Sequence, residues 1–80
     1  MNQYLLMPNK GQWIIVAAMT HEMAYASESN WYNSNTKIAV MDLETKETKI
    51  FSRKQDKNGN LIENILHETI EFDKRTGRIY

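Results

Sequence analysis

Short apolar runs separated by turn-forming residues are the main pattern along this chain. Residues 4–7 and 12–19 contain two such runs, and between them lie Pro8, Asn9 and Gly11, residue types that favour tight turns. The pattern predicts a β-hairpin. The second run is apolar at odd and even positions alike, so we expect its strand to be central, with both faces covered.

The second half of the chain continues this alternation of strands and turns. Residues 36–42 and 47–52 are predicted strands that residues 43–46 connect. Asp-initiated turn sequences follow at residues 56–59 and 73–77, and the glycine that ends the second one, Gly77, is expected in a left-handed conformation. Evenly spaced turns of this kind are typical of an antiparallel meander.

One stretch favours a helix instead of a strand. Thr20 is a good N-cap, and residues 21–26 contain Glu, Met and Ala, which are strong helix formers. Residues 27–35 then supply Ser and Asn around two large aromatic side chains, Trp31 and Tyr32. We therefore expect a short helix after Thr20, followed by an ordered loop.

Residues 60–72 are compatible with two structures. Their six apolar residues fall on one half of a helical wheel, and Asn60 followed by Glu63 resembles a capping box, which favours a helix over residues 60–68. The neighbouring turns and the β-branched residues favour strands. Periodicity alone leaves both structures open.

A local resemblance favours the strands. Residues 56–62, together with 70–73 and 77–80, resemble the hairpin pattern of tyrosine–aspartate repeats over about a third of the chain. The resemblance implies hairpins and carries no function with it. We therefore predict one mainly β domain, residues 1–80, built as a small antiparallel β-meander of five or six strands with one short helix; an α+β fold with a helix at 60–68 is the alternative.

The charges are balanced overall but segregated along the chain. The 80 residues carry ten cations and ten anions, and this net charge of zero argues against a strong non-specific nucleic-acid binder. Residues 46–57 hold five cations and two anions, whereas residues 58–73 hold four anions and no Lys or Arg. If oppositely charged segments pair as neighbouring strands, the alternation serves the fold, and we favour this role over a ligand patch.

The composition also bears on the location of the protein. Without cysteine, neither a disulfide framework nor a thiolate metal site can form, and because small secreted domains usually need such crosslinks we expect a cytoplasmic location. No apolar run approaches the ~20 residues of a membrane span, so no membrane contact is expected. Pro8, Gly11, His21 and Glu22 interrupt a weak signal-peptide pattern around residues 13–19, so we expect no export.

No set of residues indicates catalysis. His21-Glu22 and His67-Glu68 could bind a divalent metal if they converged in space, which leaves a metal-dependent hydrolase as a remote alternative. A His-Glu-x-x-His motif, a nucleophile elbow and a phosphate-binding glycine loop are all absent from the sequence. We therefore predict no enzyme activity, no cofactor and no metal site.

Trp31 and Tyr32 point most directly to a function. Their neighbours are small and polar, so no amphipathic stripe accounts for them. With Met23, Tyr25 and the nearby Met19 they could form an adaptable protein-binding surface, or they could fold back over a small core. We predict a stand-alone protein-interaction module, a regulator or inhibitor that occupies the surface of a partner protein. Homo-oligomer formation through an edge strand is a further option.

Weak nucleic-acid binding through the basic segment 46–57 is the alternative function. The side chains concerned are Lys49, Phe51, Arg53, Lys54 and Lys57. Single-stranded nucleic acid binds exposed aromatic rings interleaved with basic residues, and only this segment approaches that pattern. Phe51 is nevertheless expected in the core, because a small sheet needs its large side chains inside.

Overall fold

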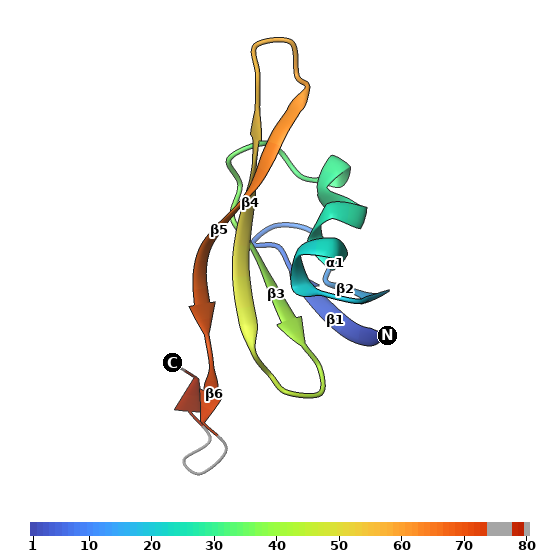
Figure 1. Ribbon diagram of the computed structural model, residues 1–80, viewed down its shortest axis with the longest axis vertical. Helices are drawn as coiled ribbons and strands as arrows, with labels where there is room; N and C mark the ends of the chain where they lie inside the picture. Colours follow the sequence, from blue (N-terminus) through green and yellow to red (C-terminus); the bar gives the residue numbers. More distant parts are fainter. Residues whose placement is uncertain (74–77, 80) are drawn as a thin grey trace.

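A computed structural model shows an open antiparallel sheet with one short helix against it (Figure 1). It describes the backbone of residues 1–73, 78 and 79, and the side chains of residues 1–60 and 63–71. The strands of the sheet are β1 (Asn2–Met7), β2 (Ile14–Ala18), β3 (Ile38–Asp42), β4 (Thr48–Gln55) and β5 (Leu61–Ile70). Helix α1 (His21–Glu28) and the 3-10 helix η1 (Ser29–Trp31) connect β2 to β3, and two short strands, β6 (Phe72–Asp73) and β7 (Arg78–Ile79), pair after β5. Neither helix in this described part has the length and apolarity needed to cross a bilayer.

The predicted mainly β architecture is confirmed. Neighbouring strands are all antiparallel, and their order across the sheet is β2-β1-β3-β4-β5. From β3 to β5 this order follows the sequence, as it does in a meander. The order departs from the sequence after β2, because the chain passes through α1 and returns to pair β3 with β1. Nothing in the apolar pattern indicates this crossover.

The expectation that residues 12–19 form a central strand is wrong. β2 lies at the edge of the sheet and pairs with β1 alone. Ile14 and Val16 pack against the core, whereas Ile15 on the other face is 61% exposed. The reason is the crossover, since β3 joins the sheet beside β1 and leaves the far side of β2 without a strand.

The alternative helix over residues 60–68 is also wrong, because these residues belong to the hairpin of β4 and β5. β5 pairs along the whole of β4, from Thr48 to Gln55, with two register shifts. Backbone hydrogen bonding to β4 therefore overrides the helical spacing of the apolar side chains. The predicted complementarity of charges is visible in the register, which sets Lys54 opposite Glu63. This hairpin extends beyond the rest of the molecule (Figure 1).

The core lies between α1 and one face of the sheet. Thr20 caps the helix as predicted, because its hydroxyl oxygen accepts a hydrogen bond from the Met23 N–H at 3.1 Å. Eight apolar side chains are buried: Tyr4, Leu6, Ala18, Ala24, Tyr25, Ile38, Val40 and Phe51. Strand side chains alternate between the two faces, and the registers place all the buried strand residues of this set on the face toward α1. Only one face of the sheet therefore contributes to the core.

The first of the two predicted Asp turns, after β4, is present. The Asp56 carboxylate accepts hydrogen bonds from the N–H groups of Asn58 and Asn60, both at 2.9 Å. The bond from Asn60 contributes most to lowering the pKa of Asp56. Its stabilising effect is therefore present above the ordinary Asp pKa and is lost as the pH falls through the lowered pKa. The turn predicted at residues 73–77, with its left-handed Gly77, falls largely outside the described residues.

Gly59 takes the left-handed position of the turn after β4, with a φ of +83°. A Cβ added there would meet no atom within 4 Å, so only backbone strain opposes a substitution. We expect Gly59→Val to lower the free energy of unfolding by about 1–2 kcal/mol, because a β-branched residue is strained at positive φ. Gly59→Asn is the matched control and should cost less, since Asn tolerates this region. Urea denaturation measures both, and equal losses would contradict a role for backbone strain.

Candidate protein-binding surface

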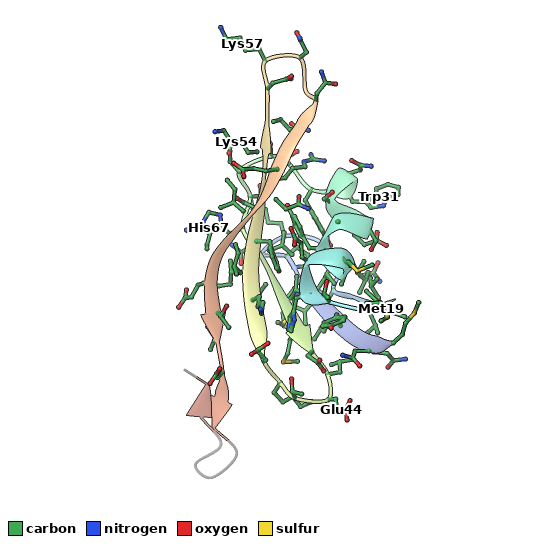
Figure 2. The ribbon with its side chains drawn as sticks, in the orientation of Figure 1. Met19, Trp31, Glu44, Lys54, Lys57 and His67 are labelled. Atoms are coloured by element: carbon green, nitrogen blue, oxygen red, sulfur yellow. The ribbon has the colours of Figure 1, made fainter. Side chains whose placement is uncertain are left out.

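Three large apolar side chains in and beside α1 and η1 are exposed to water. Met19 is 61% exposed, Met23 is 53% exposed and Trp31 is 83% exposed. Met19 directly precedes the N-cap residue Thr20, Met23 lies within α1 and Trp31 ends η1, and Figure 2 shows Met19 and Trp31 on the helix side of the molecule. We call these three residues the Met–Trp ridge. Clustered apolar side chains that a fold leaves in water indicate an interaction site.

The inner side of α1 explains why the ridge points outward. His21, Ala24 and Tyr25 are buried against the sheet, and the Tyr25 ring stacks on Phe51 with ring centroids 5.5 Å apart. Tyr25 is fully buried, so its predicted place on a binding surface is wrong. Two helical residues separate its direction from that of Met23 by about 200°, which puts the two side chains on opposite sides of the helix.

Tyr32 lies between the core and the surface. Its side chain is half-buried, packs against the core and stacks on Tyr25 with ring centroids 6.5 Å apart and planes 9° from parallel. Burial raises the pKa of both tyrosines, so both hydroxyls stay protonated at neutral pH. The two adjacent aromatic residues therefore differ: Tyr32 covers the core, whereas Trp31 is free for contact.

A buried arginine holds the segment that carries Trp31. Arg53 on β4 is 7% exposed, and its guanidinium donates to Asn30 Oδ1 at 3.2 Å and to the Tyr32 carbonyl oxygen at 2.8 Å. Within the described residues no carboxylate pairs with this guanidinium, and its Nε has no hydrogen-bond partner. The two bonds fix η1 and the residue after it over the sheet, so the position of Trp31 depends on a contact with a strand distant in the sequence.

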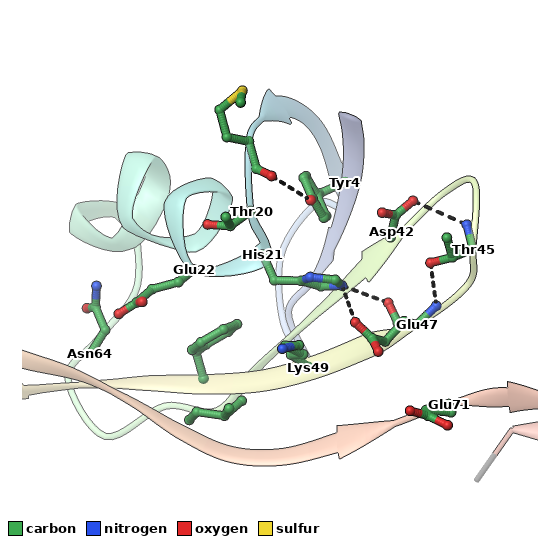
Figure 3. A pocket seen from close by; sticks show the side chains of 13 residues that line it. Tyr4, Thr20, His21, Glu22, Asp42, Thr45, Glu47, Lys49, Asn64 and Glu71 are labelled. Carbon is green, nitrogen blue, oxygen red and sulfur yellow. Dashed lines mark hydrogen bonds and ion pairs between the residues drawn. The ribbon is translucent and has the colours of Figure 1, made fainter. Parts of the chain in front are cut away.

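A groove of about 690 Å³ begins beside the ridge, between the start of α1, the β3–β4 hairpin and β5 (Figure 3). Met19 lines the groove as well as forming the ridge, and the buried rings of Tyr4 and Phe51 contribute to its lining. The charged residues of the lining are Glu22, Asp42, Glu47, Lys49 and Glu71. Carboxylates outnumber the single lysine, so we call this feature the acidic groove. Its electrostatic potential favours cationic groups.

Some polar groups of the acidic groove already have structural partners. The buried Asp42 carboxylate accepts hydrogen bonds from the N–H groups of Glu44 at 2.8 Å and Thr45 at 3.2 Å. His21 Nε2 lies 2.9 Å from the Glu47 carbonyl oxygen and 3.9 Å from the carboxylate of the same residue. These contacts hold the walls of the groove together. The carboxylates of Glu22 on α1 and Glu71 after β5 are exposed.

No protein-family model matches this chain. Neither a curated protein nor a solved structure matches it significantly. The resemblance of residues 56–62, 70–73 and 77–80 to tyrosine–aspartate repeats stays a local likeness to a hairpin pattern, and the functional argument depends on the geometry of the residues.

The side chains predicted to bind nucleic acid do not share one exposed surface. Phe51 and Arg53 are 3% and 7% exposed, so their assignment to such a surface is wrong. Lys49 is half-buried and lines the acidic groove, whereas Lys54 and Lys57 are exposed along the β4–β5 hairpin, with Lys57 near its tip (Figure 2). The expectation that Phe51 belongs to the core is confirmed. Burial of this ring removes the stacking platform that single-stranded nucleic acid needs.

The two His-Glu pairs do not converge. His21 contacts Glu47 on the helix side of the sheet, whereas His67 Nε2 lies 2.6 Å from Ser52 Oγ, a side chain of the opposite face. In the described part of the chain no three potential ligands come together in a way that could hold a metal ion. The convergence that the metal-site hypothesis requires is therefore not found there.

The contact between Ser52 and His67 was missed by sequence reasoning. A hydroxyl beside an imidazole is the arrangement of a nucleophile and its base, but Ser52 is only 3% exposed, and no described carboxylate hydrogen-bonds His67. The contact lies beside the register shift between Ile50 and Phe51 and ties β4 to β5. Unbroken pairing outward from the predicted turn at 56–59 would set Ser52 opposite Glu63, whereas the observed register sets it opposite Ile65, so no sequence signal pointed to this contact.

Proposed function

We propose that this protein is a small interaction module that binds a partner protein through the Met–Trp ridge. The exposure of Trp31 carries the proposal: 83% of this side chain is in water, although the same segment buries Tyr25 completely. Trp and Met are typical anchors of protein interfaces, where a few large side chains supply most of the binding energy. The anchoring of η1 by Arg53 orders Trp31 before binding, which lowers the entropic cost of association.

The acidic groove suggests the charge of the partner. Because Met19 belongs to both features, a segment that covers the ridge can reach the groove. Such a segment would present apolar side chains to Met23 and Trp31 and a Lys or Arg to the carboxylates of the groove. The affinity should then fall as the salt concentration rises, because salt screens interactions between exposed charges.

Binding of this kind would let a small chain regulate or inhibit its partner by covering the partner's surface. Each partner contributes about 800 Å² to a standard protein interface. The Met–Trp ridge and the acidic groove beside it would supply much of that area on this protein. A cytoplasmic location, which the cysteine-free composition favours, belongs to the same proposal.

Capture from an extract of the native cell tests the ridge. Wild-type protein, Trp31→Ala, Met23→Ala and Ile15→Ala are immobilised in parallel, and the retained proteins are identified by mass spectrometry. Ile15→Ala is the matched control, because it truncates a side chain that is 61% exposed on the opposite face. We expect at least one protein to be retained by the wild type and the control and lost from both ridge variants.

The purified partner then gives the magnitude. Trp31→Ala should weaken binding by ~2 kcal/mol or more, as expected for an interface hot spot, and should change the free energy of unfolding by no more than ~0.5 kcal/mol. If every retained protein binds Trp31→Ala and Ile15→Ala equally, the ridge is not the binding surface and the proposal fails.

A further inference from the structure

The direction of the main-chain groups in β2 follows from a hydrogen bond on the far side of β1. The Leu43 N–H donates to the Gln3 carbonyl oxygen at 3.0 Å, so the main-chain groups of Gln3 point from β1 toward β3. These directions alternate along a strand, so the groups of Tyr4 point the other way, toward Val16 on β2. Val16 in turn directs its own N–H and C=O groups back toward Tyr4.

The outer side of β2 therefore presents main-chain groups that have no strand beside them. Ile15 and Ala17 lie on either side of Val16, so their N–H and C=O groups point away from the sheet. We call these four groups the β2 edge. β2 pairs with β1 alone, and no hydrogen bond between described residues uses the β2 edge. Alternating donors and acceptors of this kind match the main chain of another extended segment.

No feature of β2 prevents such pairing. Residues 12–19 contain no charged residue, no proline and no glycine, and the register with β1 runs without a shift. The opposite edge of the same sheet differs, since β5 carries Glu63 and Glu68 and shifts register twice against β4. Charged side chains and bulges are the usual features that keep an edge strand from pairing. Of the two edges, β2 is therefore the one open to a further strand.

The Met–Trp ridge reaches both ends of β2. α1 packs against this strand, and the two lie beside each other in Figure 1. Met19 directly follows Ala18, the last residue of β2. At the other end, Trp31 and Ile14 line one groove of about 460 Å³. A segment that lies along β2 would therefore also contact the ridge.

We propose that the partner protein contributes an extended segment that joins the sheet as a further strand beside β2. This inference rests on the proposed function and adds the form of the partner's segment: about five residues, the length of β2. Its main chain would bond to the β2 edge. Apolar side chains on the face toward α1 would cover Trp31 and Ile14 in their shared groove.

Charge favours a partner with a basic residue at one end of this segment. Met19, at the end of β2, also lines the acidic groove, so a Lys or Arg placed there would meet the carboxylates of the groove. The β2 strand of a second copy would bring no such cation, because residues 12–19 contain no Lys or Arg. We therefore expect the β2 edge to bind a basic segment of another protein in preference to a second copy of this chain.

Hydrogen exchange in the presence of a peptide tests strand addition directly. The probe is Lys-Ile-Thr-Val-Thr-Ile-Lys with both termini blocked; it favours strands and reads the same in either direction. In the free protein the amides of Ile15 and Ala17 should exchange fast and that of Val16 slowly. Addition of ~1 mM peptide should slow exchange of the first two at least ~10-fold, because their N–H groups are then hydrogen-bonded.

Ala17→Pro tests the β2 edge from the side of the protein. It removes an N–H that points away from β1, and proline is tolerated at such positions of edge strands. The variant should bind the peptide at least ~10-fold more weakly, since a carbonyl of the peptide loses its donor. Ala17→Val is the matched control, because valine has a side chain of similar size and keeps the N–H; its affinity should equal that of the wild type.

A modified peptide keeps the test decisive if Ala17→Pro does not fold. Methylation of the backbone nitrogens of the three central residues removes donors on both sides of the peptide. This peptide should not bind in either strand direction. Equal binding of the methylated and unmethylated peptides to the wild type would overturn strand addition.

Several other results would contradict the proposal. They are the absence of peptide binding, unchanged exchange at Ile15 and Ala17 in the complex, and equal affinities of Ala17→Pro and Ala17→Val. Slow exchange of the two amides in the free protein that increases with protein concentration would assign the edge to a second copy and also overturn it. Partner capture tests the ridge separately: a captured protein that requires Trp31 but binds Ala17→Pro and Ala17→Val equally would leave the ridge in place without strand addition.

Discussion

Replacing Tyr25 by alanine is expected to lower the free energy of unfolding by about 3–5 kcal/mol, the usual cost of truncating a large buried aromatic residue. Tyr25 is fully buried, and its ring stacks on Phe51 and Tyr32. A domain of this size has a total stability of only ~4–12 kcal/mol. Thermal and urea denaturation should therefore show a protein close to unfolding at physiological temperature.

Tyr25→Phe is the matched control for this loss. The Tyr25 hydroxyl is buried, and it has no hydrogen-bond partner among the described groups. Removing it should leave the stability unchanged or raise it by up to ~1 kcal/mol, since a buried polar group without a partner is costly. A clear loss in Tyr25→Phe would show that the hydroxyl has a partner. A small loss in Tyr25→Ala would contradict the place of this ring in the core.

Arg53→Ala is expected to lower the free energy of unfolding by about 2–3 kcal/mol and to loosen the segment that carries Trp31. The substitution removes the hydrogen bonds to Asn30 Oδ1 and to the Tyr32 carbonyl oxygen, and bonds from a charged donor are worth ~1.5–3 kcal/mol each. Part of this loss is offset, because the substitution also removes a buried charge whose Nε has no hydrogen-bond partner among the described groups. Amide hydrogen exchange should rise after α1, in residues 29–36. Partner binding should weaken although Arg53 itself is buried, because Trp31 is no longer held in place.

Arg53→Met separates the hydrogen bonds from packing. Methionine restores much of the buried volume and removes the charge, so its loss of stability should be smaller than that of Arg53→Ala. Exchange in residues 29–36 should nevertheless rise in both variants, because neither can make the two hydrogen bonds. Unchanged exchange in both would show that another contact positions η1.

The Met–Trp ridge could be predicted from the sequence only in part. The neighbours of Trp31 are small and polar, so the segment has no apolar side that would carry Trp31 into the core. The structure leaves this side chain 83% exposed. The sequence of α1 does not indicate which side of the helix is buried. Met23 on one side and Ala24 with Tyr25 on the other are similarly apolar. Packing decided between them, since small Ala24 and flat Tyr25 fit against the sheet and Met23 does not face it.

Local chemistry is what the sequence by itself determined. The Thr20 cap and the turn at Asp56 and Gly59 follow from residue preferences that act within a few positions. These preferences fix where elements begin and end, because their hydrogen bonds join residues close in the chain.

Only the tertiary structure decided which element lies beside which. β1 is held between β2 and β3, so β2 becomes an edge strand and Ile15 is exposed. Pairing with β4 makes a strand of β5 despite its helical spacing, and the contact from Arg53 to Tyr32 crosses 21 positions. The physical reason is common to all three: hydrogen bonds and burial between distant segments outweigh local preferences of a few tenths of a kcal/mol per residue.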